Sequence, residues 1–167
     1  MPLRQDDGLH AQSSLTLDGR DFLLIGCIAP ERNPNGALWL HRPQEKYAKA
    51  AITKLHRYGD GQFCKFALED ASECAGVYVM RVKNAILYVG ESKKLRRRFN
   101  SGYGNISPKN CFVGGRQTNC RINKLVRNVL QEFERLEVWF CECDDRKALE
   151  KRLMRSLAPA WNLESIR

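Results

Sequence analysis

The chain has 167 residues, 43% of them hydrophobic and 28% charged, which suits one well-buried core and excludes a disordered or fibrous protein. Its longest apolar run near the N-terminus, residues 22–28, is too short to span a bilayer, and seven cysteines without a C-x-x-C pair favour reduced thiols. We therefore expect a cytoplasmic protein with no membrane anchor, whose net charge of +9 points to a polyanionic partner.

The N-terminal part of the chain predicts only short elements. Residues 1–19 are polar and are expected to form a loose arm. Residues 22–28 have the composition of a strand, and residues 37–41 are a candidate for a second one. Between residues 44 and 55, apolar side chains recur at helical spacing after Pro43, so a short helix is predicted there.

A clearer pattern begins at residue 76, where two apolar, β-branched segments flank a short polar turn. Residues 76–82 and 85–90 therefore predict a β-hairpin. A basic helix is expected to follow over residues 93–99. The next stretch, residues 101–119, is rich in glycine and asparagine and predicts a loop.

The last third of the chain predicts two helices with a strand between them. Thr118 or Asn119 is expected to cap the first helix, which has a strongly apolar face. Residues 136–143 alternate in a way that is typical of a strand covered on both faces. Asp144 or Asp145 is expected to cap the second helix.

Two tyrosines stand on the paired strands of the predicted hairpin, Tyr78 in a Gly-Val-Tyr triplet and Tyr88 in a Tyr-Val-Gly triplet. Adjacent strands bring such phenol groups into one neighbourhood, although either tyrosine alone is consistent with a purely structural role. Arg98 follows ten residues after Tyr88 on the basic helix. Its guanidinium lies beside the apolar stripe, where it can bind a phosphate through two hydrogen bonds.

The last helix carries a carboxylate at the margin of its apolar face. Leu149, Leu153 and Leu157 predict that face, and Glu150 lies about 20° beyond its edge. A half-desolvated carboxylate directed at the sheet suits a hard divalent cation, and an exposed helix flank is the alternative. Twelve residues on, Asn162 follows a Pro-Ala-Trp run and is expected to hydrogen-bond backbone or substrate.

These residues, in this order and at these spacings, resemble the GIY-YIG nuclease superfamily. That superfamily includes intron-homing endonucleases, some restriction enzymes and the nuclease subunit of bacterial nucleotide-excision repair. The resemblance covers about residues 74–163 and rests on the two tyrosine triplets, Arg98, Glu150 and Asn162. It implies an α/β (α+β) fold in which a small three-stranded antiparallel sheet is flanked by helices.

The resemblance also implies an activity, that of a metal-dependent endonuclease hydrolysing phosphodiester bonds in DNA, as a stand-alone enzyme of restriction, mobile elements or repair. Glu150 would hold one divalent metal ion, Mg²⁺ or Mn²⁺, and Arg98 would neutralise charge in the transition state. Tyr88 would activate the attacking water and Tyr78 would assist by hydrogen bonding. Asn162 completes this implied catalytic set.

Glu91 departs from the repair-nuclease branch, which has a lysine three residues after the second tyrosine. A free phenol has a pKa of about 10, which a neighbouring lysine would lower and a carboxylate would raise. Lys93, Lys94 or the metal ion can supply the positive charge instead. The sequence therefore leaves open which of the two tyrosines is the general base.

The basic excess lies in one part of the chain. Residues 76–167 carry 19 Lys/Arg against 9 Asp/Glu, whereas residues 1–75 carry 9 against 10. We expect the basic part to bind DNA, single- or double-stranded. The side chains predicted to contact it are Lys94, Arg96, Arg97, Arg116, Gln117, Asn119, Arg121 and Lys124.

Two parts are expected on these grounds, an N-terminal extension at residues 1–73, which matches nothing recognisable, and a nuclease domain at residues 74–167. Two other functions compete with cleavage. One is a nucleic-acid-binding module of this fold that has lost its activity, and the other is an interaction domain that acts through the N-terminal extension. The sequence does not indicate an oligomeric state.

Overall fold

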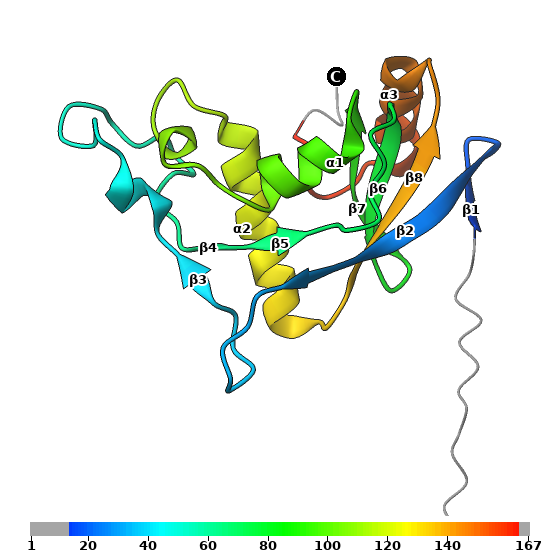
Figure 1. Cartoon of the computed structure of the whole chain (residues 1–167). Coiled ribbons are helices and arrows are strands. Elements are labelled where there is room, and N and C mark those ends of the chain that lie inside the picture. Colours follow the sequence, from blue (N-terminus) through cyan, green and yellow to red (C-terminus); the bar gives the residue numbers. More distant parts are fainter. Residues whose placement is uncertain (1–13, 164–167) are drawn as a thin grey trace, which may run out of the picture.

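The computed structural model describes residues 14–163, in which a curved antiparallel sheet has one long helix on each face (Figure 1). The strand order is β1-β2-β8-β6-β7, and every pairing along this path is antiparallel. These strands are β1 (Ser14–Leu17), β2 (Arg20–Pro30), β6 (Gly76–Val82), β7 (Ala85–Ser92) and β8 (Leu136–Glu142). Three two-residue strands complete the set: β5 (Phe66–Ala67) pairs with β2, and β3 (Leu40–His41) pairs with β4 (Phe63–Cys64).

The helices are α1 (Leu95–Arg97), a π-helix that continues it (Arg98–Tyr103), α2 (Gln117–Glu132), α3 (Arg146–Leu157), and 3-10 helices at Pro43–Lys46 and Pro108–Cys111. The two longer predicted helices are therefore confirmed. The first of them, α2, begins at Gln117 with Arg116 before it, so the prediction of a cap at Thr118 or Asn119 is wrong by two or three residues. No helix within residues 14–163 is long and apolar enough to cross a membrane.

Side chains alternate between two cores along the central strands. Tyr78 and Met80 of β6 pack in the core that α2 covers, whereas Val77 and Val79 pack in a second core against α3. Successive residues of a strand point to opposite faces, so each strand between two helices buries nearly all its side chains. The prediction that β8 is covered on both faces is confirmed.

The predicted hairpin and the strand at residues 22–28 are also confirmed, as β6–β7 and as part of β2. The prediction of a three-stranded sheet is wrong. Strands β7, β6 and β8 are the expected three, but β2 pairs with the far edge of β8, from Leu23 opposite Phe140 to Ile28 opposite Leu136. It also brings β1 into the sheet, because a short hairpin joins the two strands.

Residues 14–19, expected within a loose arm, form β1 and the turn that leads into β2. Asp18 and Gly19 in that turn have φ angles of 51° and 70°, as two-residue hairpin loops require. The remainder of the predicted arm, residues 1–13, lies outside the described residues.

The prediction of a helix between residues 44 and 55 is wrong. The structure has a 3-10 helix at Pro43–Lys46, followed by turns. Ala48 and Ala51 are exposed, and Ile52 is 84% exposed. Helical spacing stabilises a short helix only when its apolar face is buried, and these side chains have no surface to pack against. Of the candidate strand at 37–41, only β3 is formed.

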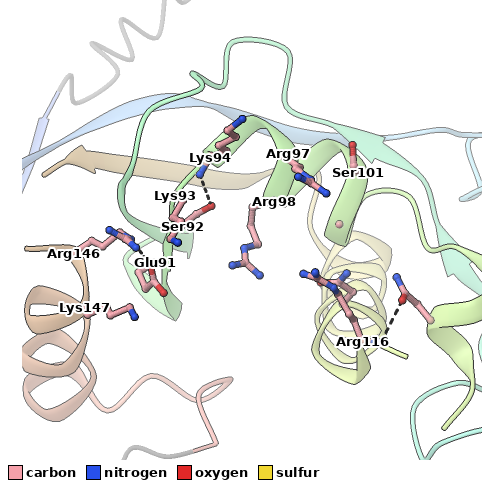
Figure 2. A pocket seen from close by; sticks show the side chains of 13 residues that line it. Glu91, Ser92, Lys93, Lys94, Arg97, Arg98, Ser101, Arg116, Arg146 and Lys147 are labelled. Atoms are coloured by element: carbon pink, nitrogen blue, oxygen red, sulfur yellow. Dashed lines mark hydrogen bonds and ion pairs between the residues drawn. The ribbon is translucent and has the colours of Figure 1, made fainter. Parts of the chain in front are cut away.

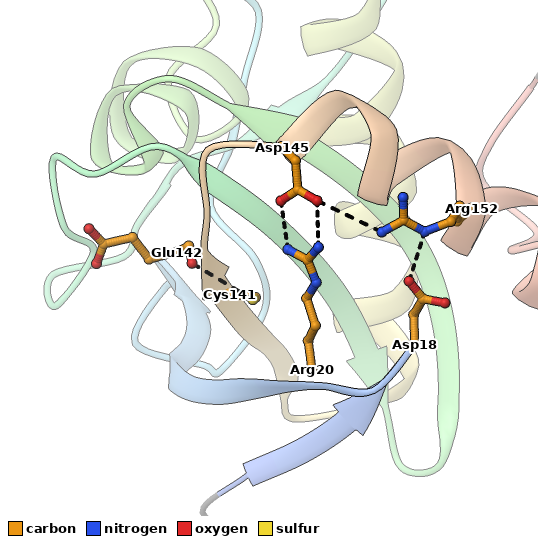
Figure 3. Close-up of polar contacts among 6 residues, drawn as sticks. All are labelled: Asp18, Arg20, Cys141, Glu142, Asp145 and Arg152. Atoms are coloured by element: carbon orange, nitrogen blue, oxygen red, sulfur yellow. Dashed lines mark hydrogen bonds and ion pairs between the residues drawn. The ribbon is translucent and has the colours of Figure 1, made fainter.

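Charged side chains join the N-terminal hairpin to α3 and to the residue before it (Figure 3). Arg20 donates two hydrogen bonds to the carboxylate of Asp145, and Arg152 donates one to Asp18 at 2.9 Å. The hydrogen bond from Arg20 lowers the pKa of Asp145. Asp145 therefore precedes α3 as expected, but its carboxylate binds β2 in place of capping the helix. This attachment helps to fix the helix that carries Glu150.

Candidate active site

Three tyrosines meet on the face of the sheet that α2 covers. The hydroxyls of Tyr78 and Tyr103 are 2.6 Å apart and hydrogen-bonded. The ring of Tyr88 has its centroid 6.1 Å from that of Tyr78 and 6.5 Å from that of Tyr103. Tyr78 and Tyr103 are each 1% exposed and Tyr88 is 8% exposed. The phenols thus form a buried polar cluster at the end of the hairpin.

The glycine of the second triplet makes room for this cluster. Gly90 on β7 lies opposite Tyr78 on β6, and a Cβ at this glycine would collide with the phenol ring of Tyr78. A residue with any side chain would displace the ring, because the strand backbones are held at a fixed separation by the ladder. The Tyr-Val-Gly triplet is therefore required for packing as well as for its tyrosine.

Tyr103 was not predicted from the sequence, and the π-helix explains why. A regular α-helix would place residues 98 and 103 on different faces, since it repeats every 3.6 residues. The π-helix bonds each residue to the fifth one along, as in the 2.7 Å bond from the amide of Gly104 to the carbonyl of Phe99. Arg98 and Tyr103 consequently share a face, and the guanidinium carbon of Arg98 lies 5.9 Å from the centroid of the Tyr103 ring.

Arg98 is charged at neutral pH, as arginine side chains are in proteins. Burial alone would lower the pKa of Arg98, but the three phenols and the carboxylate of Glu91 together raise it above its usual value. The side chain is half-buried and extends toward solvent at the end of the sheet. A permanent cation with hydrogen-bond donors is therefore held where an anionic ligand can reach it.

Burial raises the pKa of both predicted catalytic phenols. For Tyr78 the proximity of Tyr103 adds to the rise, and Arg98 opposes it. For Tyr88, Tyr103 and Glu150 add to the rise, and Arg121 opposes it. Both hydroxyls are therefore protonated at neutral pH in the unliganded protein, where they can donate hydrogen bonds.

Glu150 lies where the sequence predicted, half-buried on α3 directly after the fully buried Leu149. Its charge contributes to the raised pKa of Tyr88. Leu157 is 37% exposed, so the buried stripe of α3 is formed by Leu149 and Leu153. Within residues 14–163 no three His, Cys, Asp or Glu side chains come together as a metal site.

The side chain of Asn162 hydrogen-bonds the backbone, whereas the sequence predicted a bond to either backbone or substrate. Its Oδ1 accepts a hydrogen bond of 3.0 Å from the amide of Val89, and its Nδ2 donates one of 2.8 Å to the carbonyl of Val89. The amide of Trp161 donates to the carbonyl of Leu87 at 2.9 Å. The segment after α3 thus pairs with β7 on either side of Tyr88 and fixes the strand that carries this tyrosine.

Glu91 is paired with a cation that sequence reasoning missed. The Nε of Arg146 donates a 2.7 Å hydrogen bond to Glu91, and both side chains are more than three-quarters buried. Arg146 is the first residue of α3, 55 positions away in sequence, so no local pattern indicated the contact. The carboxylate that raises the pKa of Tyr88 is Glu150, whereas Glu91 is bonded to Arg146 and acts on Arg98.

A basic groove of about 540 Å³ opens beside these residues. Figure 2 shows the side chain of Arg98 extending into it between Arg146 and Lys147 on one side and Arg116 on the other. Its charged lining consists of one carboxylate, Glu91, and seven cations: Lys93, Lys94, Arg97, Arg98, Arg116, Arg146 and Lys147. Such a lining favours a polyanion.

The groove contains some of the side chains predicted to bind nucleic acid. Lys94, Arg97, Arg116 and Asn119 line it. Arg96 and Gln117 are exposed outside it. The side chains of the other two predicted residues bind backbone carbonyls. Arg121 donates to the carbonyl of Trp161 at 2.7 Å, and Lys124 donates to the carbonyl of Asp60 at 3.3 Å. Lys93, Arg146 and Lys147 were missed, because sequence shows their charge but not which surface they share.

The sheet, the phenol cluster, Arg98 and Glu150 together define a GIY-YIG catalytic domain. Residues 74–162 match the model of that family, the GIY-YIG catalytic domain, and the chain belongs to it. The resemblance found in the sequence is thereby confirmed.

Among curated proteins, the chain is similar to the UvrABC system protein C of Fusobacterium nucleatum subsp. nucleatum, with 27% identity over 95 residues. The matched residues are 56% of this chain and 14% of that protein, so the chain spans a small part of the relative. No solved structure matches the chain.

Proposed function

We propose that the protein is a metal-dependent endonuclease that hydrolyses phosphodiester bonds in DNA. The observation that carries this proposal is the position of Arg98, whose side chain belongs both to the phenol cluster with Tyr103 and to the basic groove. A phosphate drawn into the groove by its cations would meet Arg98, which lies next to the phenol cluster. Membership of the GIY-YIG family supports the same reaction class.

Glu150 is the residue we expect to hold the metal ion. Its carboxylate is a hard oxygen ligand, and a single such ligand suits Mg²⁺ or Mn²⁺, which keep several waters and take further oxygens from a substrate phosphate. A bound divalent ion would supply the Lewis acidity that polarises the phosphate. Glu150 also acts on the pKa of Tyr88, so a cation bound there would reduce the negative charge that this phenol faces.

Arg98 and Arg146 would bind the phosphate from two sides of the groove. Arg98 extends from the π-helix, and Arg146 from the start of α3. Glu91 binds the Nε of Arg146, which leaves both terminal nitrogens of that guanidinium available to a ligand. Glu91 is then a positioning residue for Arg146, and its negative charge is offset.

Of the two tyrosines, Tyr88 is the better candidate for the group that orients and deprotonates water. It is the more exposed of the two, at 8% against 1%. Arg121 opposes the rise in the pKa of Tyr88, and we infer that it contributes to the positive charge expected from Lys93, Lys94 or the metal ion. Asn162 would act through Val89, by holding β7 in place.

A gel assay on labelled single- and double-stranded DNA, with Mg²⁺, Mn²⁺ or EDTA, separates the competing functions. Cutting that requires the divalent ion supports the nuclease. Retardation of the DNA without cutting would identify a binding module that has lost catalysis. A protein that shows neither cutting nor retardation would instead be an interaction domain. Arg98→Ala is expected to abolish cutting, while Arg135→Ala, an exposed arginine outside the groove, serves as the matched control.

A further inference from the structure

An exposed basic lobe lies beside the groove and is not used by the catalytic centre. It consists of residues 42–58 and carries one acidic residue, Glu45. Its five cations are all exposed: Arg42, Lys46, Lys49, Lys54 and Arg57. Residues 1–75 have a small net negative charge as a whole, so the positive charge of this part of the chain is concentrated in the lobe.

The basic lobe is attached to the wall of the groove. The amide of Val113 donates a 2.8 Å hydrogen bond to the carbonyl of Lys54, and His56 bonds through its amide to Cys111 at 3.1 Å. The ring of His56 contacts the carbonyl of Asn110 at 2.5 Å. Figure 1 shows the corresponding loops, drawn in cyan and yellow-green, side by side at the end of the molecule beyond α1.

The attachment point is also part of the groove. Asn110 lines it and accepts a 3.2 Å hydrogen bond from the amide of Arg116, another lining residue. Lys54 is bonded to Val113, three residues before Arg116 along the chain. Hydrogen bonds thus join the lobe to the segment that forms one wall of the groove.

The lobe has the chemistry of a backbone contact with duplex DNA. Its two aromatic residues, Tyr47 and Tyr58, are half-buried, and Tyr47 packs on Phe112 with centroids 4.6 Å apart. Single-stranded DNA is held largely by stacking of bases on exposed aromatic rings, which the lobe lacks within the described residues. Exposed lysines without stacking rings suit the phosphates of a duplex, which recur at regular intervals along its surface.

We propose that the basic lobe binds the phosphate backbone of duplex DNA beyond the scissile strand and so extends the contact that begins in the groove. This inference rests on the proposed function, since it takes the groove to hold the strand that is cut. It also gives the N-terminal extension a role, that of a second DNA-binding surface.

The test compares two double variants that remove the same charge. Lys49→Gln with Lys54→Gln alters the lobe, and Arg135→Gln with Arg155→Gln alters two exposed positions outside the groove and the lobe. Arg57 is left intact, because it stacks on Tyr58 at 4.8 Å. Binding is measured by fluorescence anisotropy over a salt series, with a labelled duplex and with the same labelled strand alone, and cleavage is measured separately with Mg²⁺.

Each phosphate contact contributes about 0.9 to the slope of log affinity against log salt, so the lobe variant is expected to lose up to about 1.8 of the duplex slope. The control variant should keep the wild-type slope. An equal loss in both variants, an equal loss on single and double strands, or a wild-type protein that does not bind duplex would overturn the proposal. If the wild-type protein cuts DNA but the lobe variant keeps the wild-type salt slope, the role of the lobe in binding is refuted and the nuclease activity stands. If the lobe variant loses slope but the wild-type protein does not cut, the nuclease activity is refuted and duplex binding by the lobe stands.

Discussion

Replacing Asn162 by aspartate tests whether this residue acts on the strand or on the substrate. The substitution keeps the size of the side chain and the oxygen that accepts from the amide of Val89. It removes the donor, so a second carboxylate oxygen would face the carbonyl of Val89 across the present 2.8 Å contact. Two acceptors at that distance repel each other, and the carbonyl loses its partner.

The magnitude follows from these two contacts. A lost hydrogen bond of a half-buried group costs about 1 kcal/mol, and leaving the Val89 carbonyl unsatisfied against a charged oxygen adds about 1–2 kcal/mol. For a chain of this size, each kcal/mol lowers Tm by about 2–4 °C, so Asn162→Asp should melt roughly 4–12 °C lower than wild type. Acid should reduce the deficit, because a protonated carboxyl regains a donor.

The assay is thermal unfolding followed by circular dichroism at neutral and at acidic pH, together with cleavage rates well below the melting temperature. Asn162→Ala is the companion variant: it removes both hydrogen bonds and adds no titratable group, so its melting temperature should fall by a similar amount at both pH values. A variant that keeps the wild-type Tm at both pH values but loses cleavage would refute the reasoning, because Asn162 would then act on the substrate directly.

Three further predictions concern the same site. Arg146→Ala should lower kcat/KM by roughly tenfold to a hundredfold, as expected for losing a charge-assisted phosphate contact, and Arg146→Lys should retain part of the activity; equal rates in all three proteins would exclude this role. Burial raises the pKa of Tyr78 and Tyr88, so ultraviolet titration should show two tyrosines ionising well after a free phenol. The stability they contribute should be complete below about pH 10 and decline above it, because the unfolded chain ionises first, and a flat stability through that range would contradict the assignment. Asn123 is fully buried and hydrogen-bonds the backbone of Cys64 and the carbonyl of Tyr103. Asn123→Ala should therefore destabilise the protein by about 2–4 kcal/mol in denaturant unfolding. A wild-type unfolding midpoint would show that these hydrogen bonds do not stabilise the protein.

The features that the sequence predicted well are those with local signals. The hairpin of Tyr78 and Tyr88 is two apolar segments joined by a short turn, and Glu150 follows from the periodicity of a single helix. Arg98 was predicted from its spacing after Tyr88, and the structure places it beside Tyr103 and in the groove. Each of these depends on residues close together in the chain, where strand and helix periods are decisive.

The features that were missed depend on distant contacts or on a departure from the α-helical period. The addition of β2 to β8 joins residues more than 100 positions apart, and Arg146 reaches Glu91 across 55 positions. Tyr103 enters the site only because a π-helix places it beneath Arg98. The helix predicted at residues 44–55 failed for the complementary reason, since helical spacing in sequence does not show whether a surface exists to bury it.

The most direct test of the proposed nuclease uses Glu150→Gln, which keeps the size of the side chain and removes its charge. Binding and cutting are followed on the same labelled DNA, with Mg²⁺ and with EDTA. We predict that the wild-type protein cuts only with the divalent ion, and that Glu150→Gln binds the DNA with undiminished affinity but does not cut it. Cutting by the variant at the wild-type rate, or cutting by the wild-type protein in EDTA, would contradict the assignment of Glu150 as the metal ligand of a phosphodiesterase.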